Sequence, residues 1–206
     1  MNNNQNNSIL YGIGGIVIGL ILAALLFPMM RYGGMMSWGN YQNPSVRTGI
    51  ASSIDQHFIE QMIPHHEGAI AMANLALEKA THPEIKTLAE AILKAQTDEN
   101  QQMQSWYQDW FGRAVPKGST VMGGMMSQGG MHMGSSQDIS TLKTAVDFDK
   151  EFIEQMIPHH QMAIMMARML EAGTNRPEMQ QLAKNIIKSQ SEEIQQMQDW
   201  HTNWYK

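Results

Sequence analysis

The stretch FIEQMIPHH at residues 58–66 occurs a second time, letter for letter, at residues 152–160. The offset of 94 residues then continues without a gap to residue 205, and 27 of the 54 paired positions from residue 58 onward are identical. Agreement of this extent at one fixed offset is the signature of an internal duplication. The chain therefore contains one structural unit twice.

Each copy shows the pattern of two helices. The first helix is expected to run from about Ser53, where Ser53 and Gln56 form a capping box, to about Lys79. Its counterpart in the second copy is expected to end near Gly173, a suitable C′ residue. Because the repeated motif contains a proline, we expect a kink or a local break just before each histidine pair.

The second helix of each copy is expected to begin at Pro83 or Pro177, since proline is favoured in the first helical turn. It should end near Phe111 in the first copy and near Tyr205 in the second. The tryptophans near these ends are expected to close the hydrophobic end of the fold. Residues at three- and four-residue steps mark its inward face: Leu88, Ile92, Ala95, Glu99, Met103, Trp106 and Trp110.

One such hairpin cannot bury two apolar stripes, but two hairpins can bury each other. The expected fold class is therefore all-α, an antiparallel four-helix bundle of two tandem helical hairpins with approximate two-fold symmetry. The expected organisation is a membrane anchor (1–30), a Met/Gly-rich linker (31–52), the first hairpin (53–111), a second Met/Gly-rich linker (112–140) and the second hairpin (141–206).

The N-terminal segment has the character of a membrane helix. Residues 9–27 (ILYGIGGIVIGLILAALLF) are uncharged and almost wholly apolar, and a helix of that length spans about 28 Å, close to the bilayer core. No Lys or Arg precedes the run, and no small-x-small cleavage site precedes Pro28. We therefore expect a retained transmembrane helix, with a cleaved signal sequence and a soluble periplasmic protein as the alternative.

Composition excludes several classes of function. The chain has 19 acidic and 14 basic residues and a net charge of -5, without the basic patch that nucleic acid binding requires. It has no cysteine, which excludes disulfides, thiolate metal sites and a cysteine nucleophile. The motifs of zincins, di-iron carboxylate bundles, phosphate loops and dinucleotide-binding proteins are absent. The unusual residues are 20 methionines and 8 histidines.

The repeated histidine pair lies on the inward face of the first helix of each copy. Met62, His65 and Met72 share one helical stripe, and His66 lies about 100° further round. Since the hairpin turns near residue 81, Met62 and a histidine should lie level with Glu99 and Met103 of the second helix. The second copy repeats these candidates as Met156, His159, His160, Met166, Glu193 and Met197.

A single buried methionine is more often core filling than a ligand, and a single inward histidine is usually a hydrogen-bonded core residue. Here adjacent histidines and inward methionines are expected in one layer, twice over, which favours a metal site. Thioether and imidazole donors together suit Cu(I), and Ag(I) by chemical analogy. Glu99 and Glu193 are better placed to accept the distal ring N–H of a histidine than to bind metal.

Both glycine-rich linkers are also rich in methionine. In a solvated loop methionine has no core to fill, although low-complexity drift is the alternative explanation. We hypothesise that the loops gather copper loosely and pass it to the bundle. The candidates in the second linker are Met122, Met125, Met126, Met131, His132 and Met133, and those in the first are Met29, Met30, Met35 and Met36.

With these residues in view, the chain resembles the family known as domain of unknown function 305, whose members have a ferritin-like helical bundle. The family hallmark is an Asp followed by Phe-Ile-x-x-Met-Ile-Pro-His-His, then Ala and Met-Ala, which residues 55–73 and 149–167 match. The resemblance implies Cu(I) binding by Met and His. By motif position, it carries to Met62, His65, His66, Met72 and Met103 and to their partners in the second copy.

One departure separates the two copies. Gln161 and Met162 stand where the first copy has Glu67 and Gly68. The two sites are therefore expected to differ in affinity, or Met162 joins the second site.

The leading hypothesis is a membrane-anchored, extracytoplasmic Cu(I)-binding protein that buffers, sequesters or delivers copper without catalysis. Its expected partners are copper ions and copper-transport or efflux proteins. Because ligand histidines must be neutral, affinity should fall below about pH 6.5. Two alternatives stay open: a ferritin-like metal oxidoreductase, and a metal-free helical interaction module.

Overall fold

The computed structural model describes residues 45–116 and 136–206, and the elements in these two ranges are all helices. The expected all-α class is therefore confirmed, while the ferritin-like topology implied by the family resemblance stays a prediction. The helices are α2 (Ser45–Lys79), α3 (Pro83–Phe111), α5 (Ser136–Thr144), α6 (Phe148–Gly173) and α7 (Pro177–Trp204).

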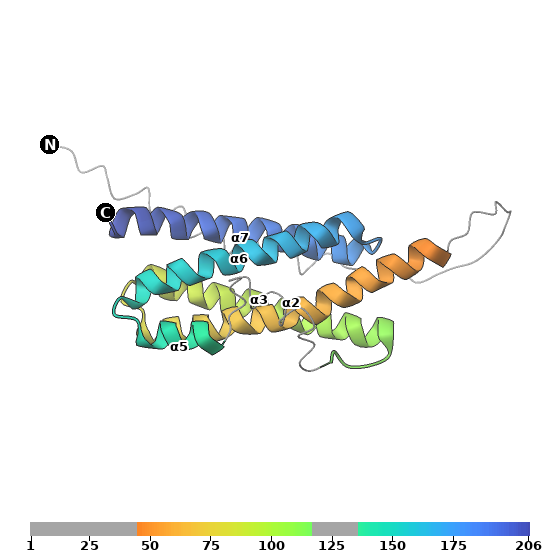
Figure 1. Ribbon diagram of the computed structural model, residues 1–206, viewed down its shortest axis with the longest axis horizontal. Coiled ribbons are helices and arrows are strands. Elements are labelled where there is room, and N and C mark those ends of the chain that lie inside the picture. The colour runs from red at the N-terminus through yellow and green to blue at the C-terminus, as the bar shows by residue number, and fades with distance from the viewer. Residues whose placement is uncertain (1–44, 117–135) are drawn as a thin grey trace. The chain divides into compact units, whose positions relative to one another are not determined.

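The four long helices form two hairpins, one from each copy of the repeat (Figure 1). Helix α2 pairs with α3, helix α6 pairs with α7, and the hairpins meet chiefly through α2 and α6. The short helix α5, which sequence reasoning did not predict, lies against α6 and α2. The first helix of each copy therefore makes most of the contact between the two hairpins.

Several parts of the sequence-based interpretation lie outside the described residues. These are the predicted anchor at 1–30, most of the first linker, and the loop candidates from Met122 to Met133. Within the two described ranges, none of the helices has the length and apolar character needed to cross a bilayer. The membrane anchor and the loop copper sites therefore stay predictions.

The helix boundaries confirm some predictions and correct others. Helices α3 and α7 begin at Pro83 and Pro177, as expected. Helix α2, however, begins at Ser45, so Ser53 is an interior helical residue and the proposed capping box is wrong. Helices α2 and α6 also continue without a break through the prolines of the repeated motif, because burial of the flanking residues holds the helical backbone together.

Gly173 has a different role from the one predicted. It is the last residue of α6 and Thr174 follows as the C-cap with an extended backbone, so Gly173 is not a left-handed C′ residue. A Cβ atom at Gly173 would clash with the side chain of Ile54 on α2. The glycine therefore permits close approach of the two hairpins. The left-handed cap occurs instead at Gly112 (φ 66°), whose N–H donates to the Gln108 carbonyl after α3.

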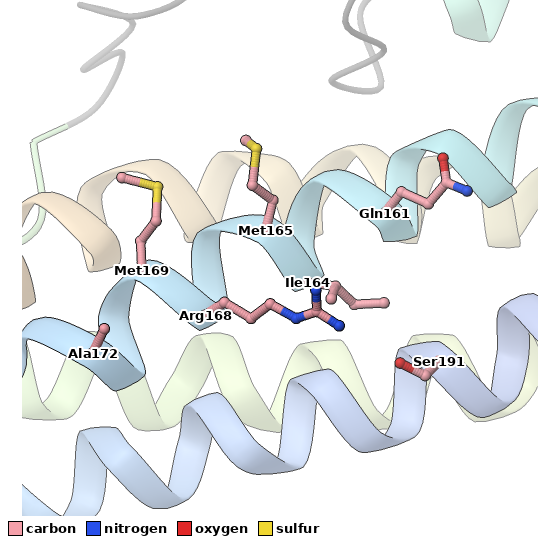
Figure 2. Close-up of a pocket in the computed structure, with 7 residues that line it drawn as sticks. All are labelled: Gln161, Ile164, Met165, Arg168, Met169, Ala172 and Ser191. Atoms are coloured by element: carbon pink, nitrogen blue, oxygen red, sulfur yellow. The ribbon is translucent and has the colours of Figure 1, made fainter.

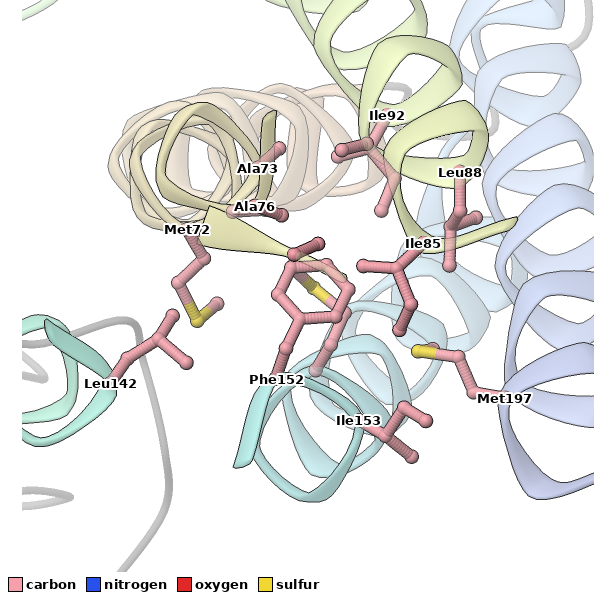
Figure 3. Packing of buried hydrophobic residues seen from close by; sticks show 14 of the residues in the cluster. Met72, Ala73, Ala76, Ile85, Leu88, Ile92, Leu142, Phe152, Ile153 and Met197 are labelled. Atoms are coloured by element: carbon pink, nitrogen blue, oxygen red, sulfur yellow. The ribbon is translucent and has the colours of Figure 1, made fainter. Parts of the chain in front are cut away.

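The hydrophobic core consists of two clusters, and each draws side chains from both hairpins. One joins Met72 and Ile85 of the first hairpin to Phe152 and Met197 of the second (Figure 3). The other joins Met62 and Met103 to residues of α6 and α7. Since burial of one such side chain contributes about 1.5–3 kcal/mol, each hairpin depends on the other for its core.

Candidate metal centre

The four histidines of the repeated motif are His65 and His66 on α2 and His159 and His160 on α6, and all four are fully buried. Neighbouring residues on a helix point about 100° apart. The second histidine of each pair therefore reaches the partner helix of its own hairpin, while the first reaches the other hairpin. The two histidines of each pair therefore contact different parts of the fold: one contacts its own hairpin and the other contacts the second hairpin.

The second histidine of each pair contacts the glutamate that the sequence singled out. His66 Nε2 lies 2.8 Å from Glu99 Oε2, and His160 Nε2 lies 2.6 Å from Glu193 Oε2. A carboxylate can only accept, so Nε2 carries the proton and donates it. The remaining Nδ1 then presents its lone pair, which is the arrangement that outer carboxylates impose on metal-binding histidines.

The first histidines of the two pairs meet each other between the hairpins. The rings of His65 and His159 have their centroids 3.7 Å apart and are tilted by 39°. Each of these histidines also lies 6.3 Å, centroid to centroid, from the second histidine of its own pair. Four imidazoles thus form one buried row that crosses from one repeat to the other.

Burial keeps the two central imidazoles neutral. Desolvation is the main reason that the pKa values of His65 and His159 lie well below the ordinary value, and repulsion from the neighbouring histidines adds to it. The backbone of each opposing histidine favours the protonated form, but it is the smallest of these effects on the pKa. A neutral imidazole is the form that binds metal.

Six ring nitrogen atoms in this row have no hydrogen-bond partner. They are both nitrogens of His65, both nitrogens of His159, and Nδ1 of His66 and of His160. Buried polar atoms are nearly always paired, because an unpaired one costs about 1–3 kcal/mol. Four of these six nitrogens carry a free lone pair, because each of the two neutral central imidazoles keeps one N–H. A bound ligand would explain such a concentration of unpaired ring nitrogens in the interior, and a metal ion fits the donor set.

The buried methionines accompany the histidines as the helical spacing predicts. Met62 lies one turn before His66 on α2, and Met103 lies one turn after Glu99 on α3; both methionines are fully buried in one core cluster. The second repeat has the same arrangement, with Met156 and Met197 fully buried in the other cluster. Each repeat therefore buries two methionines, each one helical turn from a member of its histidine–glutamate contact.

Met72 and Met166 are arranged differently from the other candidates, because each packs in the cluster that holds the two buried methionines of the opposite repeat. Met72 belongs to the cluster of Met156 and Met197, and the partly buried Met166 packs against the cluster of Met62 and Met103. Met162, the extra methionine of the second copy, is buried on α6 with 8% of its surface exposed. Sequence spacing within one repeat could not reveal these contacts between repeats.

The donor set restricts the kind of metal. Within residues 45–116 and 136–206, no three side chains of the types His, Cys, Asp and Glu converge as a metal site would require. An ion in the interior would therefore need thioether sulfur in addition to imidazole. Thioethers are poor donors to Zn²⁺, Mg²⁺ and ferric iron and good donors to Cu(I).

Sequence reasoning missed a pair of contacts that join the repeats outside this centre, which we call the latches. In the first latch, Asp149 of the second repeat accepts hydrogen bonds from the Thr81 and His82 backbone N–H groups, from the Thr81 hydroxyl and from His82 Nδ1 at 2.6 Å. The His82 ring stacks on Trp204 with centroids 3.9 Å apart. The stacked pair of Trp200 and Trp204 covers this side of the core.

The second latch occupies the equivalent position with different chemistry. Asp55 of the first repeat lies 3.1 Å from Arg176 Nε, and the guanidinium stands 3.9 Å above the Trp110 ring. The Arg176 backbone N–H donates to Thr174 rather than to the aspartate. The sequence signal for both latches was the aspartate at one fixed position in each repeat. His201 also lies outside the row of imidazoles and contacts Glu154.

The fold and the buried row together define a duplicated helical protein with an interior centre of imidazole and thioether donors. Residues 55–201 match the family described as "Domain of unknown function (DUF305)". The chain therefore belongs to this family, as the repeated motif predicted.

Solved structures support the same relationship. The chain is similar to CopM in the Cu(I)-bound form, with 51% identity and a TM-score of 0.65 over 74% of this chain and 98% of that one. For CopM in the Ag-bound form the identity is 49% and the TM-score 0.63, over 74% and 97% of the two chains. A DUF305 fragment from Deinococcus radiodurans is 27% identical with a TM-score of 0.65, over 74% and 98%.

Among curated sequences, the chain is similar to the uncharacterized protein L153 of Acanthamoeba polyphaga mimivirus. The two are 47% identical over 49 residues, which is 24% of this chain and 32% of that protein. This match spans about a third of the relative and supplies no activity.

Proposed function

We propose that this protein binds Cu(I), and Ag(I) in the same way, in the interior of its helical bundle, and that it buffers, sequesters or delivers copper without catalysis. The observation that carries the proposal is the set of six buried imidazole nitrogens without hydrogen-bond partners. The similarity to CopM, which has been crystallised with Cu(I) and with silver, supports this choice of metal.

The proposed ligands are the two symmetric layers. In the first, the Nδ1 atom of His66 and the sulfur atoms of Met62 and Met103 would hold one ion, while Glu99 fixes the histidine tautomer. His160, Met156, Met197 and Glu193 would do the same in the second. His65 and His159 would complete both sites from the centre, and Met72 and Met166 would add thioethers from the clusters in which they pack.

The location of the protein is part of the proposal. Methionine is a soft ligand that does not form disulfides under oxidising conditions, so a cysteine-free copper site suits a compartment outside the cytoplasm. The apolar run at residues 9–27 would anchor the bundle to the membrane, facing the periplasm. Copper-transport or efflux proteins would be the donors and acceptors.

The direct test is competition for Cu(I) between the purified protein and a colorimetric Cu(I) chelator. We expect the wild-type protein to withdraw Cu(I), and a variant with all four motif histidines replaced by leucine to lose this ability. The matched control replaces His82 and His201, which are bonded to carboxylates outside the centre. Equal withdrawal by wild type and the four-histidine variant would refute the interior site.

A second measurement separates binding from catalysis and from a metal-free role. Oxygen uptake with excess Cu(I) should show no sustained turnover, and Cu(I) should raise the melting temperature while Zn²⁺ does not. Sustained oxygen consumption that disappears in the four-histidine variant would instead establish an oxidoreductase. A melting temperature that no soft metal changes would support an interaction module.

A further inference from the structure

Two methionines on α6 lie outside the interior centre and are exposed to solvent. Met165 is 40% exposed and Met169 is 61% exposed. Large apolar side chains are seldom this exposed here: the other example in the described parts of the chain is Val146. A methionine at the surface fills no core, so core packing does not account for its position.

The two exposed methionines lie one helical turn apart and therefore share a face of α6. Figure 2 shows both sulfur atoms on the same side of the helix, directed away from α7. Methionine has three rotatable side-chain bonds, so two thioethers at this spacing can approach one ion from both sides. A pair of soft donors on one face is a chelating arrangement for a monovalent soft metal.

The hollow beside the pair offers no set of ligands for hard cations. Met165 and Met169 border a hollow of about 610 Å³, whose other lining residues include no carboxylate. Its one cationic side chain, Arg168, extends along the other side of the helix from the two sulfur atoms (Figure 2). Divalent ions that prefer oxygen ligands find no anionic partner in this lining.

The duplication provides an internal comparison. At the equivalent positions, 94 residues earlier, the first repeat has Ala71 and Leu75 instead of methionine. The candidate interior methionines Met62, Met72 and Met103, in contrast, all have methionine counterparts in the second copy. The exposed pair is therefore a feature of the second repeat alone, which the symmetric interior sites do not require.

A graded series of soft donors connects this surface to the centre. Along α6, at steps of three or four residues, His159 is fully buried, Met162 is 8% exposed, Met165 is 40% exposed and Met169 is 61% exposed. The same steps in the first repeat pass from His65 through glycine and alanine to leucine. Only the second repeat offers a donor at every turn between solvent and the buried imidazoles.

We propose that Met165 and Met169 form an exposed site for a monovalent soft metal ion and that this site is the entrance to the interior centre, by way of Met162. Metal binding by Met165 and Met169 does not require that the proposed function is correct. Their role as an entrance does require it, because it assumes an interior copper centre. Open coordination positions and solvent exposure make the exposed site the weaker and faster-exchanging one.

Binding at the entrance is tested by NMR of the methionine methyl groups in the full-length protein, with Ag(I) as a redox-stable probe. We expect the resonances of Met165 and Met169 to shift together, assigned through M165A and M169L, which introduce the types of residue found in the first repeat. Either single substitution should weaken binding at this site about tenfold or more, because one thioether lacks the chelate effect.

The outcomes separate the two proposals. Shifts confined to interior methionines, or a shift of only one of the exposed pair, would overturn the entrance and leave the interior site standing. An absence of any methyl shift would overturn both. Persistence of the Met165 and Met169 shifts in the four-histidine variant would show that the surface site binds on its own.

The role as an entrance is tested by the rate of Cu(I) uptake from a colorimetric chelator. The M165A/M169L variant and M162L should each load about tenfold more slowly, and the surface variant should reach the same final interior occupancy. V146A, which changes the other exposed large apolar side chain, is the matched control and should load as wild type. Wild-type loading rates in both methionine variants would overturn the role as an entrance.

Discussion

The two repeats are alike in the interior and different at their edges. Both bury the same histidine pair, the same glutamate contact and the same two methionines. At the latches, however, one aspartate faces a histidine and the other faces an arginine. The comparison therefore separates residues that the interior centre requires from residues that only hold the two hairpins together. Each role can be tested by changing one repeat and keeping the other as the control.

The largest expected effect comes from the central histidines. H65L/H159L removes two proposed ligands, so Cu(I) affinity should fall by more than the 10–100-fold typical of outer contacts. The apo protein should lose less than about 1 kcal/mol of stability, since four unpartnered buried nitrogens are removed with these rings. Chelator competition and urea unfolding of the same samples measure the two effects.

The pH dependence of this variant supplies a further check. Because burial lowers the pKa of both central histidines, the unfolded chain binds more protons than the folded one below about pH 6.5. Wild-type apo protein should therefore lose stability as pH falls below that value, and H65L/H159L should lose less. An identical acid profile in both proteins would contradict the neutral buried pair. The sequence predicts that Cu(I) affinity falls below about pH 6.5. Because the pKa values of His65 and His159 are lowered, these two ligands should lose affinity only at a lower pH.

The latches come next in expected size. Hydrogen bonds from Thr81 and His82 lower the pKa of Asp149 despite its burial, whereas desolvation raises the pKa of Asp55, and the Thr174 hydroxyl and the Arg176 guanidinium offset this only in part. D149N should cost about 2–3 kcal/mol at pH 7, because several charge-assisted hydrogen bonds are lost. D55N should cost less than about 1 kcal/mol, and urea unfolding of both variants gives the comparison.

The same pair has opposite acid behaviour. A lowered folded pKa means that Asp149 stabilises the fold above the unfolded value of about 4 and that this contribution is lost as pH falls below it. A raised folded pKa means that Asp55 contributes most at low pH and less as pH rises through its folded value. Equal losses in D149N and D55N, with equal pH profiles, would show that the latches are interchangeable.

Sequence reasoning reached the all-α class, the second-helix starts and a contact of Glu99 and Glu193 with a histidine, because these follow from local periodicity within one hairpin. It left open which histidine of each pair makes the contact, and the structure identifies His66 and His160. It could not reach the close approach of the His65 and His159 rings or the cluster in which Met72 packs, since both depend on how the hairpins dock. The predicted start of the first helix was wrong. Ser53 and Gln56 have the sequence of a capping box, but helix α2 continues back to Ser45.

The glutamates are expected to have an intermediate effect. E99Q keeps a side chain of similar shape but removes the charge that orients His66, so affinity at the first site should fall about 10–100-fold. E193Q should do the same at the second site. In a titration monitored through methionine methyl resonances, each variant should weaken the shifts of its own layer only. Equal weakening of both layers by either substitution would show that the two repeats share one site.

The smallest effect tests whether the two layers are independent. If each ion lies between the histidines of its own pair, the centroid distances place the two ions no more than about 10 Å apart. Two unit charges at about 10 Å repel by about 1.7 kcal/mol at an effective dielectric constant of about 20, which is more than a tenfold reduction in the second affinity. Wild-type protein should therefore bind Ag(I) in two steps, whereas E99Q, with one weakened layer, should retain a strong first step of unchanged affinity. Two equal steps in the wild type would mean that the row of imidazoles screens one site from the other.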